Sequence, residues 1–310
     1  MLIMESDFKY RKILVHSVSS KDKKELGSFL REIPLNEKKL ANFAQNSVLP
    51  DTYRTLVWKV LLNITPRYAE SHSYVRQQQD LVYEDLWRTL KVLRLRIPIA
   101  LSNGEYSGVS NGSNGKLADV QNPEPEHYLL MWLISEAKLL HDPISQMRCD
   151  ENRGYIIIAH RLSTFFDHPV EFFHFYSALW SLLQKNKEAI LDAYNDAIAL
   201  LKKKNGNLHL HLLRVGLFGS NIMKNHCLSL FCDIFPESAV EKILDKIIAG
   251  AFKITTYVVV SLLSHMEQSL LTADNVERIR NCFIQLRKEE ADLIVQKALT
   301  HWNSRNSPRK

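Results

Sequence analysis

The stretch that decides the fold reads VYEDLWRT and spans Val82 to Thr89. It lies in a long run, from about Tyr68 to Ile97, that contains neither Gly nor Pro. Apolar residues recur in this run at helical spacing, namely Val82, Leu86, Leu90, Leu93 and Ile97. The period predicts an amphipathic helix that buries one apolar stripe.

Two charged residues of this stretch, Asp85 and Arg88, are three positions apart and can face each other on a helix. Arg88 is about 200° from Leu86 at 100° per residue, which puts it off the predicted apolar stripe. An arginine presented on a rigid helix and steadied by a carboxylate can stabilise phosphate charge. The same pair can equally be an ordinary surface ion pair, which contributes only ~0.2–1 kcal/mol.

The composition favours one large helical protein. The chain has 310 residues, 45% of them hydrophobic, and only ten Gly and ten Pro. Such a chain can bury a sizeable core, and it favours long helices over many short strands. The net charge of +6 is mild and spread along the chain, so no nucleic-acid partner is expected. Short basic runs at 21–24 and 202–204 are typical of solvated helix faces; an acidic partner or a membrane surface is the alternative.

Cysteine and histidine spacing predicts neither disulfides nor a metal site. The four cysteines form no CxxC pair, which favours free thiols in a reducing compartment. His209 and His211 are two apart and would lie on opposite sides of a helix, so no metal is expected. No signal peptide is recognised, and no apolar run reaches about 18 residues. The prediction is a soluble cytoplasmic protein without a metal or cofactor.

The predicted organisation is one helical domain with two irregular ends. Residues 1–48 form an N-terminal arm followed by two short helices, Lys21–Arg31 and Asn36–Asn46. The helical domain covers 49–303, and 304–310 is a basic tail. Residues 102–122 are rich in Gly, Asn and Ser, and we interpret them as a flexible loop inside the domain, because the helical pattern resumes directly after them.

Further helices complete an all-α prediction, as one compact unit or as two lobes around the 102–122 loop. They are expected over Leu49–Leu62, Glu126–Leu140, Asp150–Phe166, Val170–Leu183, Lys187–Lys204, Leu208–Phe218, Met223–Phe235, Ser238–Ala249, Phe252–Leu271, a segment ending near Arg287, and Glu289–Trp302. The run Ile254–Val260 favours a strand by propensity alone. Its length without a turn residue favours a buried helix instead.

Local catalytic motifs are sparse. The chain contains no phosphate loop of the GxxxxGK[ST] type and no GxSxG motif. Four landmarks nevertheless follow one another in a recognisable order: Arg54-x-x-x-Trp58-x-x-Leu61-Leu62, then Val82-x-x-Asp85-x-x-Arg88-Thr89, then Phe235-Pro236 with Leu244-Asp245 and Gly250, and then an apolar helix. Together they resemble the TBC domain, an all-helical domain of GTPase activators for Rab-type small GTPases.

This resemblance implies that the protein acts on GTP bound to a partner GTPase. In the family an arginine from the IxxDxxRT motif enters the GTPase site, where such an arginine contributes ~10³–10⁵ in rate. A glutamine from a YxQ motif orients the attacking water. By resemblance, Arg88 is the candidate arginine finger and Asp85 orients it. Tyr155 matches the tyrosine, but Ile157 stands at the glutamine position and has neither a donor nor an acceptor.

Smaller matches are similar to a divergent branch of the family, for example Glu70-Ser71-His72 and Pro236-Glu237-Ser238. A member of that branch is the third subunit of the hamartin–tuberin complex, which restrains TOR signalling through the GTPase Rheb. The resemblance therefore implies a non-catalytic interaction subunit that binds a hamartin-type coiled coil and reaches endomembranes only through that complex. The first alternative is an active Rab GTPase activator that uses Arg88, with any catalysis exerted in trans. The second is a helical scaffold without a GTPase.

Overall fold

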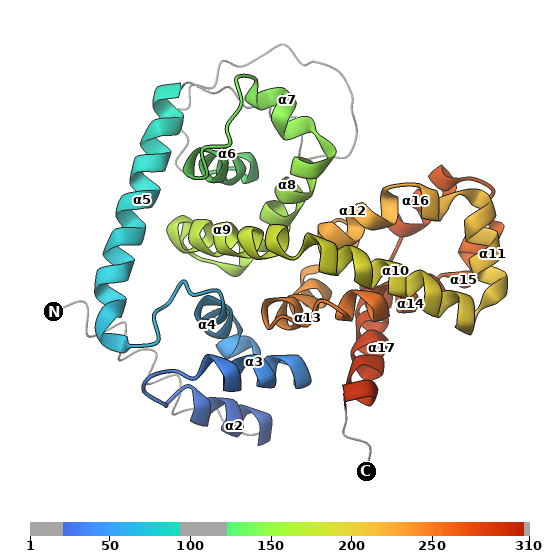
Figure 1. Ribbon diagram of the computed structural model, residues 1–310, viewed down its shortest axis with the longest axis horizontal. Helices are drawn as coiled ribbons and strands as arrows, with labels where there is room; N and C mark the ends of the chain where they lie inside the picture. Colours follow the sequence, from blue (N-terminus) through green and yellow to red (C-terminus); the bar gives the residue numbers. More distant parts are fainter. Residues whose placement is uncertain (1–20, 94–122, 307–310) are drawn as a thin grey trace. The chain divides into compact units, whose positions relative to one another are not determined.

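The protein is all-α in the computed structural model, which describes residues 21–93 and 123–306. Within these ranges every regular element is a helix, so the predicted fold class is confirmed (Figure 1). The arm before Lys21, the 102–122 loop, the predicted helix end at Ile97 and residues 307–310 of the basic tail lie outside the described residues. No helix in the described ranges is long and apolar enough to cross a membrane.

The chain divides into two compact units. The first comprises residues 1–76 and 178–310, and the second comprises residues 77–177. The divisions fall inside two long helices, α5 (His72–Leu93) and α9 (Pro169–Lys185), and not at the 102–122 loop. Each unit therefore contains a part of both helices.

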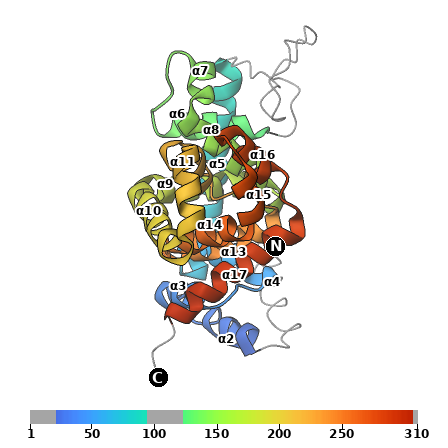
Figure 2. The same cartoon turned by 90° about the vertical axis from the view of Figure 1, so that its right-hand side faces the viewer.

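The first unit is built around α14 (Ile254–His265), which packs against α10 (Lys187–Lys204) and α17 (Lys288–Asn306). Every residue of α14 from Ile254 to Leu263 is buried, which explains why its strand-like composition is accommodated in a helix. Figures 1 and 2 show the other helices of this unit. They are α2 (Lys21–Phe29), α3 (Glu37–Asn46), α4 (Asp51–Leu61), η1 (Ala69–Ser71), α11 (Gly206–Val215), η5 (Leu217–Gly219), α12 (Ile222–Leu228), α13 (Glu237–Ile248), α15 (Glu267–Thr272) and α16 (Val276–Ile284).

The second unit has an aromatic core. It contains α5 from Gln77 onward, α6 (Pro125–Ser135), α7 (Pro143–Arg148), α8 (Asp150–Leu162), η4 (Ser163–Phe165) and the first part of α9. Phe172, Phe173, Phe175 and Tyr176 of α9 are each at most 2% exposed. Tyr128 of α6 meets Phe172 edge-on, with ring centroids 4.7 Å apart. These aromatic side chains form the core of the second unit.

The buried stripe of α5 differs from the predicted one. Val82 and Leu93 are each 46% exposed, whereas Tyr83 and Leu90 are buried. The Tyr83 ring lies 6.0 Å from Phe173, and the Trp87 ring lies 5.2 Å from His127. These aromatic contacts turn Tyr83 and Trp87 toward the core and leave Val82 and Leu93 exposed. Leu90 of the predicted stripe is buried as expected.

Several predicted helices end earlier than expected, among them Leu208–Phe218, which ends at Val215, and Asp150–Phe166, which ends at Leu162 before η4. The segment Met223–Phe235 is helical only to Leu228, because Leu230 and Phe231 adopt positive φ and His226 Nδ1 bonds Asp233 Oδ2. The segment Phe252–Leu271 is two helices, α14 and α15, separated at Met266. The helix beginning near Glu126 ends at Ser135 instead of Leu140, and the short helix α7 that follows was not predicted.

Candidate functional site

The candidate arginine lies on the exposed side of α5. Arg88 Nη1 and Asp85 Oδ1 are 3.1 Å apart, and the two side chains are 71% and 74% exposed. The Thr89 hydroxyl donates to the Asp85 carbonyl at 2.8 Å. On the opposite side, Tyr83 and Trp87 contact α9 and α6. The helix thus holds the arginine in solvent on a buttressed backbone, and the predicted ion pair is formed.

The candidate second-finger position lies on α8 of the same unit. Tyr155 is 2% exposed, and its ring is 5.7 Å from that of Trp132. Its carbonyl accepts a hydrogen bond from the Tyr176 hydroxyl at 3.5 Å. Ile157 is half-buried, between the buried residues Ile156 and Ile158. Tyr155 is therefore a core residue, and the side chain at the glutamine position reaches the surface without a polar atom.

The first and third landmarks meet in one buried network of the first unit. Arg54 Nε is 3.2 Å from Asp245 Oδ1, and Trp58 Nε1 donates to the same oxygen at 2.9 Å. The Leu49 amide donates to Asp245 Oδ2 at 3.2 Å. Arg54 also pairs with Glu241 at 3.0 Å and with Asp51. The network fastens α4 to α13, so these landmarks are structural.

A buried lysine extends the network. Lys246 is 1% exposed, and its Nζ donates to the carbonyls of Ala44 at 2.7 Å and Ser47 at 2.6 Å. Burial lowers the pKa of Lys246 to about 8, although the negative charge of Asp245 opposes that shift. Burial likewise raises the pKa of Asp245 to about 6, although Arg54 and Lys246 oppose that shift. The group therefore joins the end of α3 to α13.

The remaining landmark residues, Pro236 and Gly250, delimit α13. Pro236 occupies the N-cap position with φ −70° and ψ 165°. Gly250 follows the helix with φ +86°, a conformation that a side chain disfavours. Its amide donates to the Ile247 carbonyl at 2.9 Å and closes the helix.

Sequence reasoning missed Glu241 and the role of Lys246. A signal was available, because Arg54 and Trp58 are four apart on α4 and Glu241 and Asp245 are four apart on α13. Each pair occupies one helix face. The sequence does not show that these faces of α4 and α13 pack against each other.

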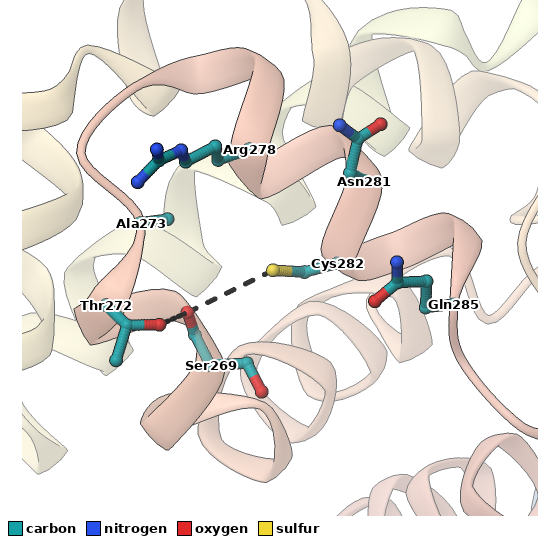
Figure 3. A pocket seen from close by; sticks show the side chains of 7 residues that line it. All are labelled: Ser269, Thr272, Ala273, Arg278, Asn281, Cys282 and Gln285. Carbon is teal, nitrogen blue, oxygen red and sulfur yellow. Dashed lines mark hydrogen bonds between the residues drawn. The ribbon is translucent and has the colours of Figure 1, made fainter.

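A shallow depression of about 360 Å³ lies between α15 and α16 (Figure 3). Its lining is mixed, polar and apolar in similar measure, and includes Arg278, Asn281 and Cys282. Arg278 is already paired with Asp274 at 3.0 Å, and Cys282 Sγ lies 4.0 Å from the Ser269 carbonyl oxygen. None of the candidate site residues lines it. The described residues also contain no cluster of His, Cys, Asp and Glu that could hold a metal ion.

Known proteins resemble this chain in sequence. No protein-family model matches the chain. TBC1 domain family member 7 of Homo sapiens is 26% identical over 293 residues, with 91% of this chain and 89% of the human protein covered. TBC1 domain family member 7 of Danio rerio is 27% identical with the same coverage.

Two solved structures share the fold. The Ypt/Rab-GAP domain of Gyp1p superposes with a TM-score of 0.56 at 13% identity, covering 93% of this chain and all of that domain. The Chlamydomonas flagellar RabGAP TBC domain superposes with a TM-score of 0.50 at 15% identity, covering 93% and 96%. The chain is therefore similar to TBC1 domain family member 7 over 91% of its length, and it shares the fold of the two Rab-GAP TBC domains.

Proposed function

We propose that this protein is a non-catalytic interaction subunit that binds a hamartin-type coiled coil in a hamartin–tuberin complex, and so takes part in restraining TOR signalling through Rheb. The likeness to TBC1 domain family member 7 supports the partner class. The observation that carries the proposal is Ile157, an apolar residue at the position where the family's glutamine orients water. A side chain without a donor or an acceptor cannot perform that step.

The exposed face of α5 suits a helical partner. At 100° per residue, Leu81, Asp85, Arg88 and Val92 fall within about 60° of one another. Leu81 is 49% exposed and Val92 is 74% exposed, and they bracket the ion pair along the helix. Apolar anchors beside a charged pair form the pattern with which amphipathic helices and coiled coils recognise one another.

Co-purification with a hamartin C-terminal coiled coil tests the proposal. The wild-type chain is expected to co-elute with the coiled coil at micromolar concentration. The double variant Leu81→Glu and Val92→Glu should separate from it, because losing each buried apolar anchor costs about 2 kcal/mol. Leu140→Glu is the matched control, since Leu140 is 62% exposed in the same unit but outside α5. Separate elution of the wild type would refute the proposal.

A second candidate function is Rab GTPase activation by Arg88 alone. The exposure of Arg88 supports it, because an exposed pair with Asp85 is weak enough to release the guanidinium to a GTPase. Single-turnover GTP hydrolysis across a Rab panel tests it, with Arg88→Ala as the loss variant and Ile157→Gln as the gain variant. If no Rab responds to the wild type or to Ile157→Gln, this function is excluded.

A further inference from the structure

The junction of α10 and α11 carries a concentrated positive charge. Lys202, Lys203 and Lys204 form the last turn of α10, and all three are exposed. They form no ion pair with any residue in the described part of the chain. Lysines at a helix C-terminus complement the helix dipole, which explains their tolerance there. The dipole does not account for the apolar residues beside them.

Two leucines are exposed directly after this turn. Leu210 is 59% exposed and Leu213 is 55% exposed. At 100° per residue, they and the exposed Arg214 lie within about 100° of one another on α11. The opposite side of α11 is fully buried at Leu208 and Leu212. Since that buried side already attaches α11 to the unit, the outward leucines are not needed for folding.

The junction is rigid. The Asn205 side chain accepts a hydrogen bond from the Leu208 amide at 3.0 Å and so caps α11. Its Nδ2 donates to Glu267 Oε1 at 2.7 Å, which engages that nearby carboxylate and ties the junction to α15. Figures 1 and 2 show α11 continuing from the end of α10 as a separate helix. The lysines and the leucines are therefore held in one arrangement.

The charge of the last lysine of α10 acts on one residue of α17, His301. Burial, and next the charge of Lys204, lower the pKa of His301. His301 is an exposed residue of α17, so the lysine end of α10 lies close to that helix. Glu188, Asp192 and Asp196, the acidic residues of α10, lie nearer its N-terminus. The last turn of α10 is thus purely basic, although a further lysine, Lys187, begins the helix.

We propose that Lys202, Lys203, Lys204, Leu210, Leu213 and Arg214 form a docking surface for an anionic lipid membrane. Long basic side chains reach the lipid phosphates while neighbouring leucines enter the boundary with the acyl chains. Charge complementarity selects an anionic surface. The two aliphatic side chains, with no aromatic side chain among the six, favour lipid over nucleic acid, whose bases stack on rings. The surface lies in the first unit, whereas α5 beyond Gln77 and Ile157 belong to the second, so it shares no residue with the proposed coiled-coil site.

Vesicle sedimentation of the full chain tests this surface. Wild type is expected to pellet with phosphatidylcholine vesicles that contain 30% phosphatidylserine, and not with pure phosphatidylcholine. Replacing the three lysines by glutamine should weaken binding about 100-fold, because each lysine near an anionic surface contributes about fivefold. Leu210→Gln with Leu213→Gln should weaken it about tenfold, since both leucines are already partly buried in the protein.

A matched control separates local from overall charge. Lys24→Gln, Lys38→Gln and Lys253→Gln remove the same charge from exposed positions elsewhere in the first unit. This control should bind within about threefold of the wild type, since charges beyond a Debye length are screened. The proposal is overturned if the wild type does not distinguish the two vesicles, if the control loses as much binding as the patch variant, or if the wild type binds only a nucleic acid or an acidic protein.

Discussion

Replacing Asp245 by alanine should destabilise the first unit by about 3–5 kcal/mol, the range for breaking a buried ion pair from one side. The substitution takes an acceptor from Arg54 Nε, from Trp58 Nε1 and from the Leu49 amide, which lie 2.9–3.2 Å from the carboxylate. Glu241 and Asp51 still face Arg54, so its charge keeps partners. Each buried donor that loses its acceptor costs about 1–3 kcal/mol, which is consistent with the same range.

Urea unfolding followed by circular dichroism measures this loss, and amide hydrogen exchange in α4 and α13 locates it. Asp245→Asn should lose about half as much, since the amide keeps one acceptor oxygen in the same shape. Asp196→Ala, an exposed change on α10, should stay within about 0.5 kcal/mol of the wild type. If the free energies of unfolding of Asp245→Ala and Asp196→Ala differ by less than about 1 kcal/mol, the buried network does not hold α4 to α13.

Three other predictions concern pH, a turn and the candidate arginine. Burial lowers the pKa of His174, so below pH 6.5 the unfolded chain binds more protons than the folded chain. The free energy of unfolding should therefore fall as the pH drops through that value, by at most about 1.4 kcal/mol per pH unit. His174→Gln should flatten the dependence of the urea midpoint on pH between pH 7 and 5, and the exposed change His160→Gln should flatten it less. Gly250→Ala should cost about 1–2 kcal/mol, because φ is +86° there, whereas Gly27→Ala should be neutral or stabilising; equal urea midpoints would contradict this. Arg88→Ala should change stability by less than about 1 kcal/mol, and a larger loss would show that Arg88 is structural.

Features that depend on neighbours along the chain were predictable from the residues alone. The Asp85–Arg88 pair forms because residues three apart meet on any helix. Asn36 caps α3 by accepting a hydrogen bond from the Lys39 amide, a role that asparagine commonly takes directly before a helix. The helical class followed from long runs without Gly or Pro, and α10 has its predicted bounds.

The choice of buried face on α5 was not predictable in this way. Both Val82 and Tyr83 are apolar enough to enter a core, and helical periodicity does not rank them. The contacts of Tyr83 with Phe173 and of Trp87 with His127 decide the rotation, and they involve helices that lie far along the chain. The same rotation leaves Leu81 and Val92 beside Arg88 on the exposed face.

The residues alone indicated an all-helical chain, a resemblance to TBC domains and a candidate arginine, Arg88, with Ile157 at the position that the resemblance assigns to a glutamine. Only the tertiary structure decided that Arg54 and Trp58 converge on Asp245, which is 187 residues beyond Trp58 in the chain. It also decided that Lys246, the next residue of the same helix, is buried. The physical reason is that helix formation is set by residues three and four apart, whereas a buried charge can be assigned only when all the groups that compensate it are in place.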